Sequence, residues 1–256
     1  MFDGRARDGT PDDSVGSTAS IGDAAKRPVL CILHQHSSNP GHVGHWFRRN
    51  GYHLDIRRHF DGQPLPDTLA GHCGALIFGG PQSANDATDY IRREIDWIAV
   101  PLKERKPFFG ICLGAQMLAR HLGARVDHCP TGSVEIGYHP IKATSSGRRY
   151  AFPETVFQWH REGFELPRDS ELLATSDGCY PNQAFRHGSA VGVQFHPEIT
   201  YAQVTRWSGG NPMRLLMRGA QPRGAQIDQH LMNVSSVQCW LDSFLKQWVA
   251  GTWTVS

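Results

Sequence analysis

Short apolar runs alternate with helix-like stretches along the first half of this chain, and this alternation limits the fold more than any other feature. The strand-like apolar runs cover residues 29–33, 52–57, 75–78 and 108–111. The helical stretches cover residues 43–50, 90–104 and 113–122. In the second of them, isoleucines recur at helical spacing at positions 91, 95 and 98. This alternation predicts an α/β fold with a mostly parallel central sheet flanked by helices.

The second half of the chain follows a different pattern. Strand-like segments are closely spaced there, which predicts a short antiparallel extension of the sheet; they cover residues 136–141, 155–157, 184–186 and 191–195. Residues 235–249 predict an amphipathic closing helix, whereas residues 208–223 are rich in Gly, Pro and Arg and predict irregular structure. Residues 1–26 predict a disordered tail, and residues 27–256 are interpreted as a single domain.

Composition narrows the classes of function. The 256 residues include 26 Lys and Arg against 24 Asp and Glu, and a net charge of +2 does not indicate nucleic-acid binding. No apolar run is long enough for a membrane span and the N-terminus lacks a secretory apolar region, so we expect a cytoplasmic protein. The 6 cysteines are scattered without a C-x-x-C pair. We therefore expect neither a disulfide framework nor a zinc site, but free thiols in a reducing compartment.

The most informative string spans residues 108–116, where an apolar strand runs into Gly110, Cys112 and Gly114 and then into a helix. This is the thiol form of a nucleophile elbow, in which small flanking residues let neighbouring backbone pack closely. The sulfur would lie at a helix N-terminus, where the dipole favours the thiolate. The next N–H, that of Leu113, would point to a developing oxyanion. The alternative is that Cys112 is a buried structural cysteine in a tight turn.

A second motif supplies a base for that thiol. A strand-like segment ends at His196, and Glu198 follows two residues later across Pro197. A nucleophilic thiol needs a base within reach, and the base needs an acceptor that fixes its tautomer. The alternative is a surface histidine beside a solvated glutamate, since the chain contains 14 histidines.

Two glycines follow the strand-like run of residues 75–78. Gly79 and Gly80 could bring bare backbone N–H groups close to a ligand, and so complete an oxyanion hole. The alternative is a simple turn.

In this order, the Gly79-Gly80-Pro81 segment, the string from Gly110 to Gln116 and the His196-Pro197-Glu198 segment resemble the class I (triad) glutamine amidotransferases. The resemblance covers residues 29–201 and is closest to stand-alone GMP-synthase-like amidotransferase domains. It implies the flavodoxin-like architecture of that family, with a central parallel sheet between helices.

The resemblance also implies a role for each matched residue. Cys112 would attack the carboxamide carbon of glutamine and form a γ-glutamyl thioester. His196 would move the proton, and Glu198 would orient His196. The main-chain N–H groups implied to hold the oxyanion are those of Leu113, Gly79 and Gly80.

The implied substrate pocket departs from the family pattern. Its residues are Gln116, Trp159, His160, Arg161 and Glu162. Relatives often carry Gly or Ser followed by Asp after that histidine, where this chain has Arg161 and Glu162. A long cation there could crowd the pocket or recruit a second carboxylate, so free glutamine and γ-glutamyl conjugates both remain open as substrates.

Four histidines gather after the first strand, at positions 34, 36, 42 and 45. No Cys, Asp or Glu nearby completes a metal site, so we interpret them as a polar loop at the rim of the cleft. We expect no metal and no cofactor.

Several functions follow from these residues. In one, the chain is a glutaminase subunit that hands ammonia to a separate synthetase. In another, it acts alone as a γ-glutamyl peptidase or hydrolase. A non-catalytic binding module and a cysteine α/β-hydrolase are further alternatives, although the hydrolase fold expects its acid before the histidine rather than after it. The expected partners are a small-molecule substrate and a separate synthetase, without nucleic acid or membrane, and the sequence allows a homodimer.

Overall fold

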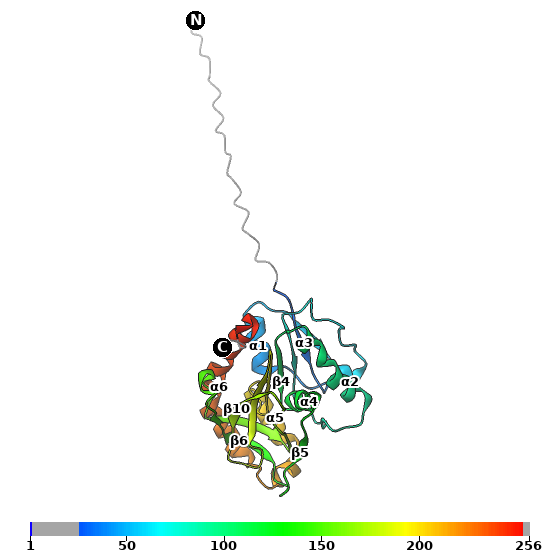
Figure 1. Ribbon diagram of the computed structural model, residues 1–256. Helices are drawn as coiled ribbons and strands as arrows, with labels where there is room; N and C mark the ends of the chain where they lie inside the picture. The colour runs from blue at the N-terminus through cyan, green and yellow to red at the C-terminus, as the bar shows by residue number, and fades with distance from the viewer. Residues whose placement is uncertain (2–25, 253–256) are drawn as a thin grey trace.

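One sheet of eight strands runs through the centre of the chain in the computed structural model, which describes Met1 and residues 26–252 (Figure 1). The tail predicted for residues 1–26 lies almost entirely outside the described residues. The strand order is β2-β1-β3-β4-β12-β11-β10-β7. The parallel strands are β1 (Val29–Ile32), β2 (Leu54–Arg57), β3 (Gly74–Ile77), β4 (Phe108–Ile111) and β12 (Ala190–Val193).

The remaining strands of the sheet are antiparallel, as the sequence predicted. They are β11 (Asn182–His187), β10 (Glu171–Thr175) and β7 (Lys142–Ala143). Two separate ribbons lie beside the sheet. One pairs β5 (Val126–His128) with β9 (Glu162–Phe164), and the other pairs β6 (Glu135–Pro140) with β8 (Thr155–His160). The α/β fold with a mostly parallel sheet and an antiparallel extension is thus confirmed.

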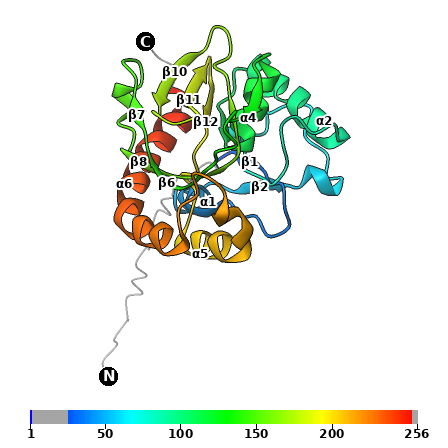
Figure 2. The same ribbon diagram turned by 90° about the horizontal axis from the view of Figure 1, so that it is seen from below.

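Helices cover both faces of the sheet (Figures 1 and 2). They are α1 (Gly41–Arg49), α2 (Asp89–Trp97), α3 (Ala99–Lys103), α4 (Leu113–His121), α5 (Tyr201–Gly210) and α6 (Arg223–Ala250). Short 3₁₀ turns are η1 (His59–Asp61), η2 (Arg148–Tyr150) and η3 (Pro212–Leu216). None of the helices in the described part of the chain is both long and apolar enough to cross a bilayer.

The hydrophobic core forms one layer on each side of the sheet. Val29 and Cys31 of β1 pack in the layer that contains side chains of α1 and α6, such as Phe47. Leu30 and Ile32 point the other way, into the layer built with α2 and α4. Because every residue of β1 is buried, the strand is continuously apolar, as expected for a parallel strand covered on both faces.

The sequence-based prediction missed part of the C-terminal half. Helix α5 was not predicted, although Thr200 and Gln203 form a capping box at its start. Helix α6 begins at Arg223, well before the predicted residue 235, although Ile227, Leu231 and Val234 already recur there at helical spacing.

The expectation that the cysteines form no disulfide is wrong. Cys129 and Cys179 are joined by a disulfide, with their Cα atoms 5.8 Å apart and 50 positions apart in sequence. The end of β5 and the β10–β11 connection lie side by side in the fold, so a scattered pair in sequence becomes a close pair in space. The free cysteines among the described residues are Cys31, Cys73, Cys112 and Cys239.

Candidate active site

Cys112 occupies the turn between β4 and α4. Its backbone has φ 51° and ψ −105°, a conformation that a non-glycine residue adopts only when its surroundings hold it there. The N–H of Cys112 donates to the carbonyl of Val193 on β12 at 2.8 Å, and its own carbonyl accepts from Gln116 N–H at 3.0 Å. The strand, the neighbouring strand and the helix together fix this cysteine at the carboxyl edge of the sheet.

The two glycines that flank Cys112 are required by packing. A Cβ atom at Gly110 would lie 2.5 Å from the carbonyl oxygen of Gly114. A Cβ atom at Gly114 would lie 2.1 Å from the carbonyl oxygen of Ile77 on β3. Neither backbone oxygen can move out of the way cheaply, so the turn can form only with glycine at both positions.

His196 and Glu198 form a buried hydrogen-bonded pair just after β12. His196 Nδ1 and Glu198 Oε1 are 2.8 Å apart, and each residue is 3% exposed. The backbone N–H of His196 donates to the carbonyl of Phe157, and the ring of Trp207 packs edge-on against the imidazole at 5.0 Å between centroids. Main chain, carboxylate and indole thus hold the imidazole in one orientation.

The imidazole lies next to the cysteine across Gly79. A Cβ atom at Gly79 would lie 2.7 Å from His196 Cε1 and 3.5 Å from Cys112 Cβ, so both side chains border the same point. Burial would lower the pKa of His196, but the charges of Glu198 and Cys112 outweigh it and raise this pKa to about 10. His196 Nε2 has no hydrogen-bond partner of standard geometry among the described residues.

Leu113, Gly79 and Gly80 line the hollows beside Cys112, and their main-chain N–H groups donate to no acceptor among residues 26–252. Leu113 is the first residue of α4, where backbone donors have no partner inside the helix. Gly80 packs against His34, and a side chain at Gly80 would collide with that ring. The residues predicted to supply oxyanion donors therefore line the same hollows as Cys112.

The five predicted substrate-pocket residues all border one small hollow beside Cys112. They are Gln116, Trp159, His160, Arg161 and Glu162. Trp159 to Glu162 cover the turn from β8 to β9, and Gln116 lies on the first turn of α4. The hollow is also lined by Arg214, from η3, which the sequence analysis did not single out.

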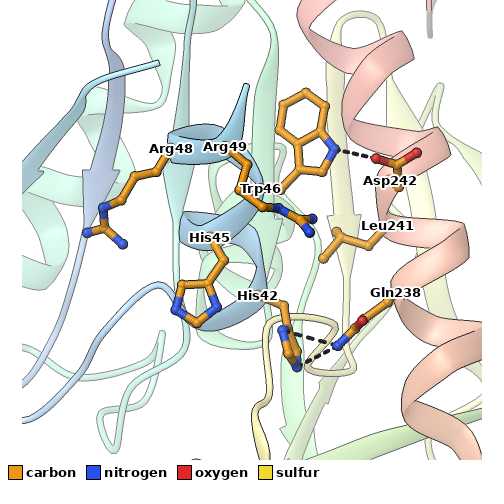
Figure 3. Close-up of a pocket in the computed structure, with 8 residues that line it drawn as sticks. All are labelled: His42, His45, Trp46, Arg48, Arg49, Gln238, Leu241 and Asp242. Carbon is orange, nitrogen blue, oxygen red and sulfur yellow. Dashed lines mark hydrogen bonds between the residues drawn. The ribbon is translucent and has the colours of Figure 1, made fainter. Parts of the chain in front are cut away.

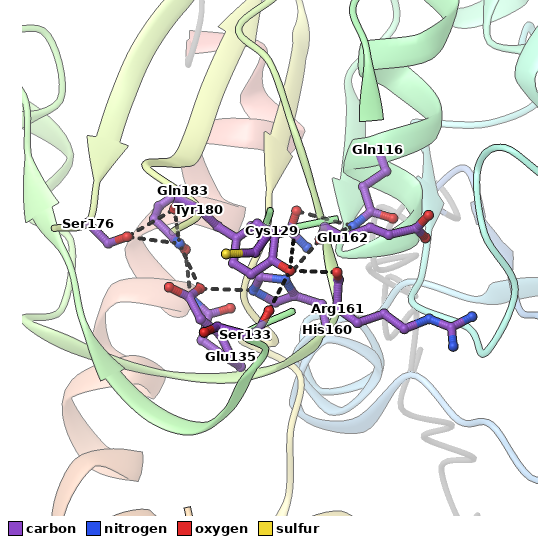
Figure 4. A network of polar contacts seen from close by, with 12 residues as sticks. Gln116, Cys129, Ser133, Glu135, His160, Arg161, Glu162, Ser176, Tyr180 and Gln183 are labelled. Atoms are coloured by element: carbon purple, nitrogen blue, oxygen red, sulfur yellow. Dashed lines mark hydrogen bonds and ion pairs between the residues drawn. The ribbon is translucent and has the colours of Figure 1, made fainter. Parts of the chain in front are cut away.

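A buried polar network holds the β8–β9 turn in place (Figure 4). The side-chain amide of Gln116 donates to the carbonyl of Glu162 at 2.8 Å. His160 contacts the same carbonyl through Nδ1 at 2.9 Å and the carboxylate of Glu135 through Nε2 at 3.0 Å. Gln116 and His160 thus position the wall of the hollow, while Figure 4 shows the Arg161 side chain directed away from the network.

Glu135 sets the charge of this network. Burial would raise the pKa of Glu135, but hydrogen bonds from His160 and Gln183 and the nearby imidazole charges lower it overall. His160 thus bridges the Glu135 carboxylate and the carbonyl of Glu162 with its two ring nitrogens.

Tyr180 extends the network to the disulfide. Its hydroxyl accepts from the N–H of Cys129 at 3.1 Å and donates to the carbonyl of Arg161 at 2.5 Å. Its ring packs on His160 with 4.9 Å between centroids. The disulfide partner Cys179 is the residue next to Tyr180, so the covalent link lies directly behind the substrate-pocket turn.

A second hollow opens on the other side of Cys112. Cys112, Gly79 and His196 line it, together with Trp159 and with Arg206 and Trp207 from α5. Gln35, Ser37 and Ser38 also line it, so the loop after β1 lies at its rim, whereas none of the four histidines predicted at the rim lines this hollow. Neither α5 nor η3 was predicted, and their Arg206, Trp207 and Arg214 were therefore missed; the arginine content of residues 206–223 was the available signal.

The four histidines after β1 serve separate contacts. His34 is buried and pairs with Glu94 at 2.7 Å, whereas His36 is exposed. His42 and His45 line a surface groove between α1 and α6, where Gln238 contacts the His42 ring (Figure 3). Across the described residues, no group of three metal-ligating side chains comes together.

Comparison with known proteins places this geometry in a family context. The family model described as "Glutamine amidotransferase class-I" matches residues 36–205. The glutamine amidotransferase-like protein YfeJ of Salmonella typhimurium is 32% identical over 188 residues, which cover 69% of this chain and 77% of YfeJ. A glutamine-hydrolyzing GMP synthase subunit from Thermoplasma volcanium is 32% identical over 144 residues, which cover 54% of this chain and 68% of that protein.

Solved structures of similar proteins share this fold. The crystal structure of a glutamine amidotransferase from Thermotoga maritima superimposes with a TM-score of 0.78 at 30% identity, covering 87% of this chain and 97% of that one. Against whole GMP synthases, the chain matches about a quarter of their length.

Proposed function

Because the chain belongs to the class I glutamine amidotransferase family, we propose that it hydrolyses a γ-glutamyl amide through a Cys112–His196–Glu198 triad. The observation that carries this proposal is the buried His196–Glu198 pair at 2.8 Å, facing a cysteine held at a strained strand-to-helix turn. The sulfur can act as nucleophile, the imidazole as its base, and the carboxylate as the group that orients the imidazole.

Each chemical step has a residue suited to it. The Cys112 thiolate attacks the amide carbon, and the N–H groups of Leu113 and Gly79 stabilise the resulting oxyanion. The C–N bond then breaks, and the imidazolium of His196 protonates the departing amine, which leaves a γ-glutamyl thioester on the sulfur. Water, deprotonated by His196, attacks the thioester and releases glutamate. With glutamine and one water, the products are glutamate and ammonia.

The raised pKa of His196 suits this sequence. A pKa of about 10 keeps the imidazole protonated at neutral pH, ready to deliver a proton to the leaving amine. Glu198 holds that charge and fixes Nδ1 as a donor, so that Nε2 faces the sulfur side.

The relatives suggest a partner. One of them is named as one subunit of a GMP synthase, and by analogy ammonia released here would pass to a separate synthetase protein. A chain that acts alone on γ-glutamyl conjugates uses the same triad and differs only in the leaving group.

Labelling with 6-diazo-5-oxonorleucine tests the triad assignment. We expect intact mass and peptide analysis to find one adduct on Cys112, slowed by added glutamine and absent in Cys112→Ser. The other described free cysteines, Cys31, Cys73 and Cys239, provide internal controls. Adducts on one of these cysteines instead, or no adduct at all, would overturn the proposal.

A further inference from the structure

Two hollows meet at Cys112 and share Gly80, Pro81 and Trp159 as walls. The smaller, on the Gln116 side, has a cavity volume of about 30 Å³, and the larger, on the His196 side, has a cavity volume of about 370 Å³. A substrate whose scissile carbonyl lies over the sulfur therefore extends into both, with its acyl part in one and its leaving group in the other.

The position of His196 decides which part lies where. The imidazole must protonate the departing amine, so the amine has to lie on the side of His196. His196 lines the larger hollow and does not line the smaller one. The γ-glutamyl group is therefore directed toward the smaller, open hollow, and the leaving amine toward the larger one. Ammonia, about the size of water, needs about 30 Å³, far less than the larger hollow offers.

The walls of the larger hollow combine aromatic surface with a positive charge. The rings of Trp159 and Trp207 lie 5.9 Å apart, and Arg206 follows the same edge of α5. In the described part of the chain, the arginines in ion pairs are Arg57, Arg125 and Arg186. Arg206 is thus exposed without an acidic partner there. Such a surface suits an amine with an apolar body and a carboxylate.

The smaller hollow also carries positive charge. Arg161 and Arg214 both line it, and neither forms an ion pair within residues 26–252. Burial and the charge of Arg161 lower the pKa of Arg214, which fits two guanidinium groups that face a common space. Glu162 borders this hollow too, but its carboxylate already accepts from Ser83 at 2.9 Å. Two unpaired cations fit the α-carboxylate of a γ-glutamyl group.

We propose that the substrate is a γ-glutamyl amino acid, whose leaving group is an α-amino acid that Arg206 binds through its carboxylate. The inference rests on the proposed function and adds its substrate class. The Cys112 sulfur forms a bond to the γ-carbonyl carbon while the C–N bond breaks, and His196 gives its proton to the amino-acid nitrogen. Water then cleaves the thioester, so one γ-glutamyl amino acid and one water give glutamate and the free amino acid.

Three substrates test this assignment in the purified full chain: L-glutamine, γ-glutamyl-leucine and γ-glutamyl-leucinamide. We expect kcat/KM for γ-glutamyl-leucine to exceed the value for each of the other two by about tenfold or more, because the carboxylate makes a charge-assisted hydrogen bond. Arg206→Gln should reduce the preference for γ-glutamyl-leucine over its amide to less than about threefold, and Arg206→Lys should retain part of it. Arg93→Gln, an exposed arginine on α2, serves as the matched control.

The outcomes separate this inference from the proposed function. If glutamine reacts at Cys112 and is the best of the three substrates, the triad stands and the substrate class is wrong. If Arg206→Gln slows γ-glutamyl-leucine and its amide equally, the carboxylate contact is wrong. If no substrate yields glutamate and Cys112 forms no adduct, the proposed function itself fails.

Discussion

Replacing Glu198 with glutamine tests how much of the chemistry depends on the buried acid. The pKa of His196 rises from its ordinary value near 6.5 to about 10, a difference equivalent to about 5 kcal/mol in favour of the imidazolium. Glu198 is the stronger of the two charges that raise it, ahead of Cys112. The charge-assisted hydrogen bond between His196 and Glu198 is worth roughly 2–3 kcal/mol by itself.

Glu198→Gln keeps the size of the side chain but removes that stabilisation. The pKa of His196 should then fall well below 10, because burial, which lowers it, is no longer opposed by the carboxylate. Roughly 2–3 kcal/mol corresponds to a loss of roughly 10²-fold in the rate of Cys112 acylation at neutral pH. The high-pH limit of the rate profile should also move to lower pH, since the proton donor is lost earlier.

The assay is the rate of Cys112 modification by 6-diazo-5-oxonorleucine from pH 5 to pH 10, followed by mass analysis. Glu165→Gln, an exposed glutamate paired with Arg125, is the matched control and should react like the unaltered protein. The reasoning is refuted if Glu198→Gln reacts within about threefold of the unaltered protein across this range.

Further predictions concern stability. Gly114→Ala should destabilise the fold by roughly 3 kcal/mol in urea unfolding because its Cβ meets a β3 carbonyl oxygen, whereas Gly71→Ala, with open space, should change little; equal midpoints would contradict this. Reducing Cys129–Cys179 should lower the unfolding free energy by about 4 kcal/mol in the chain-entropy model, and an unchanged midpoint would oppose it. Because the pKa of His196 is raised, the imidazolium contributes its full stabilisation below about pH 6.5, and this stabilisation is lost as pH rises through about 10. His196→Gln should therefore make the unfolding free energy fall less steeply over this pH range.

The motifs around Cys112 and His196 could be predicted because the interactions that shape them join residues close together in the sequence. The sequence around Cys112 shows the strand, the small flanking residues and the following helix, and these alone define the turn. His196 and Glu198 are two residues apart, so their contact needs no knowledge of the rest of the fold. The parallel order of the first strands also follows from their alternation with helices.

The missed features depend on distant contacts. The disulfide joins residues 50 positions apart, and their pairing follows only from the neighbouring positions of two loops. Arg206 and Arg214 come from α5 and η3, whose sequence is rich in glycine and arginine and shows weak helical periodicity. The resemblance located His160 and Gln116 at the pocket, but only the structure shows that both side chains hold the β8–β9 turn.

The central claim is that Cys112 carries the γ-glutamyl group during turnover. Acid quenching of the unaltered protein within milliseconds of mixing with a γ-glutamyl substrate, followed by peptide mass analysis, measures this directly. We predict that the peptide containing Cys112 gains the mass of a γ-glutamyl group, that the gain decays as glutamate appears, and that Cys112→Ser shows none. Turnover without any acylated Cys112 peptide, or acylation at another residue, would contradict the account.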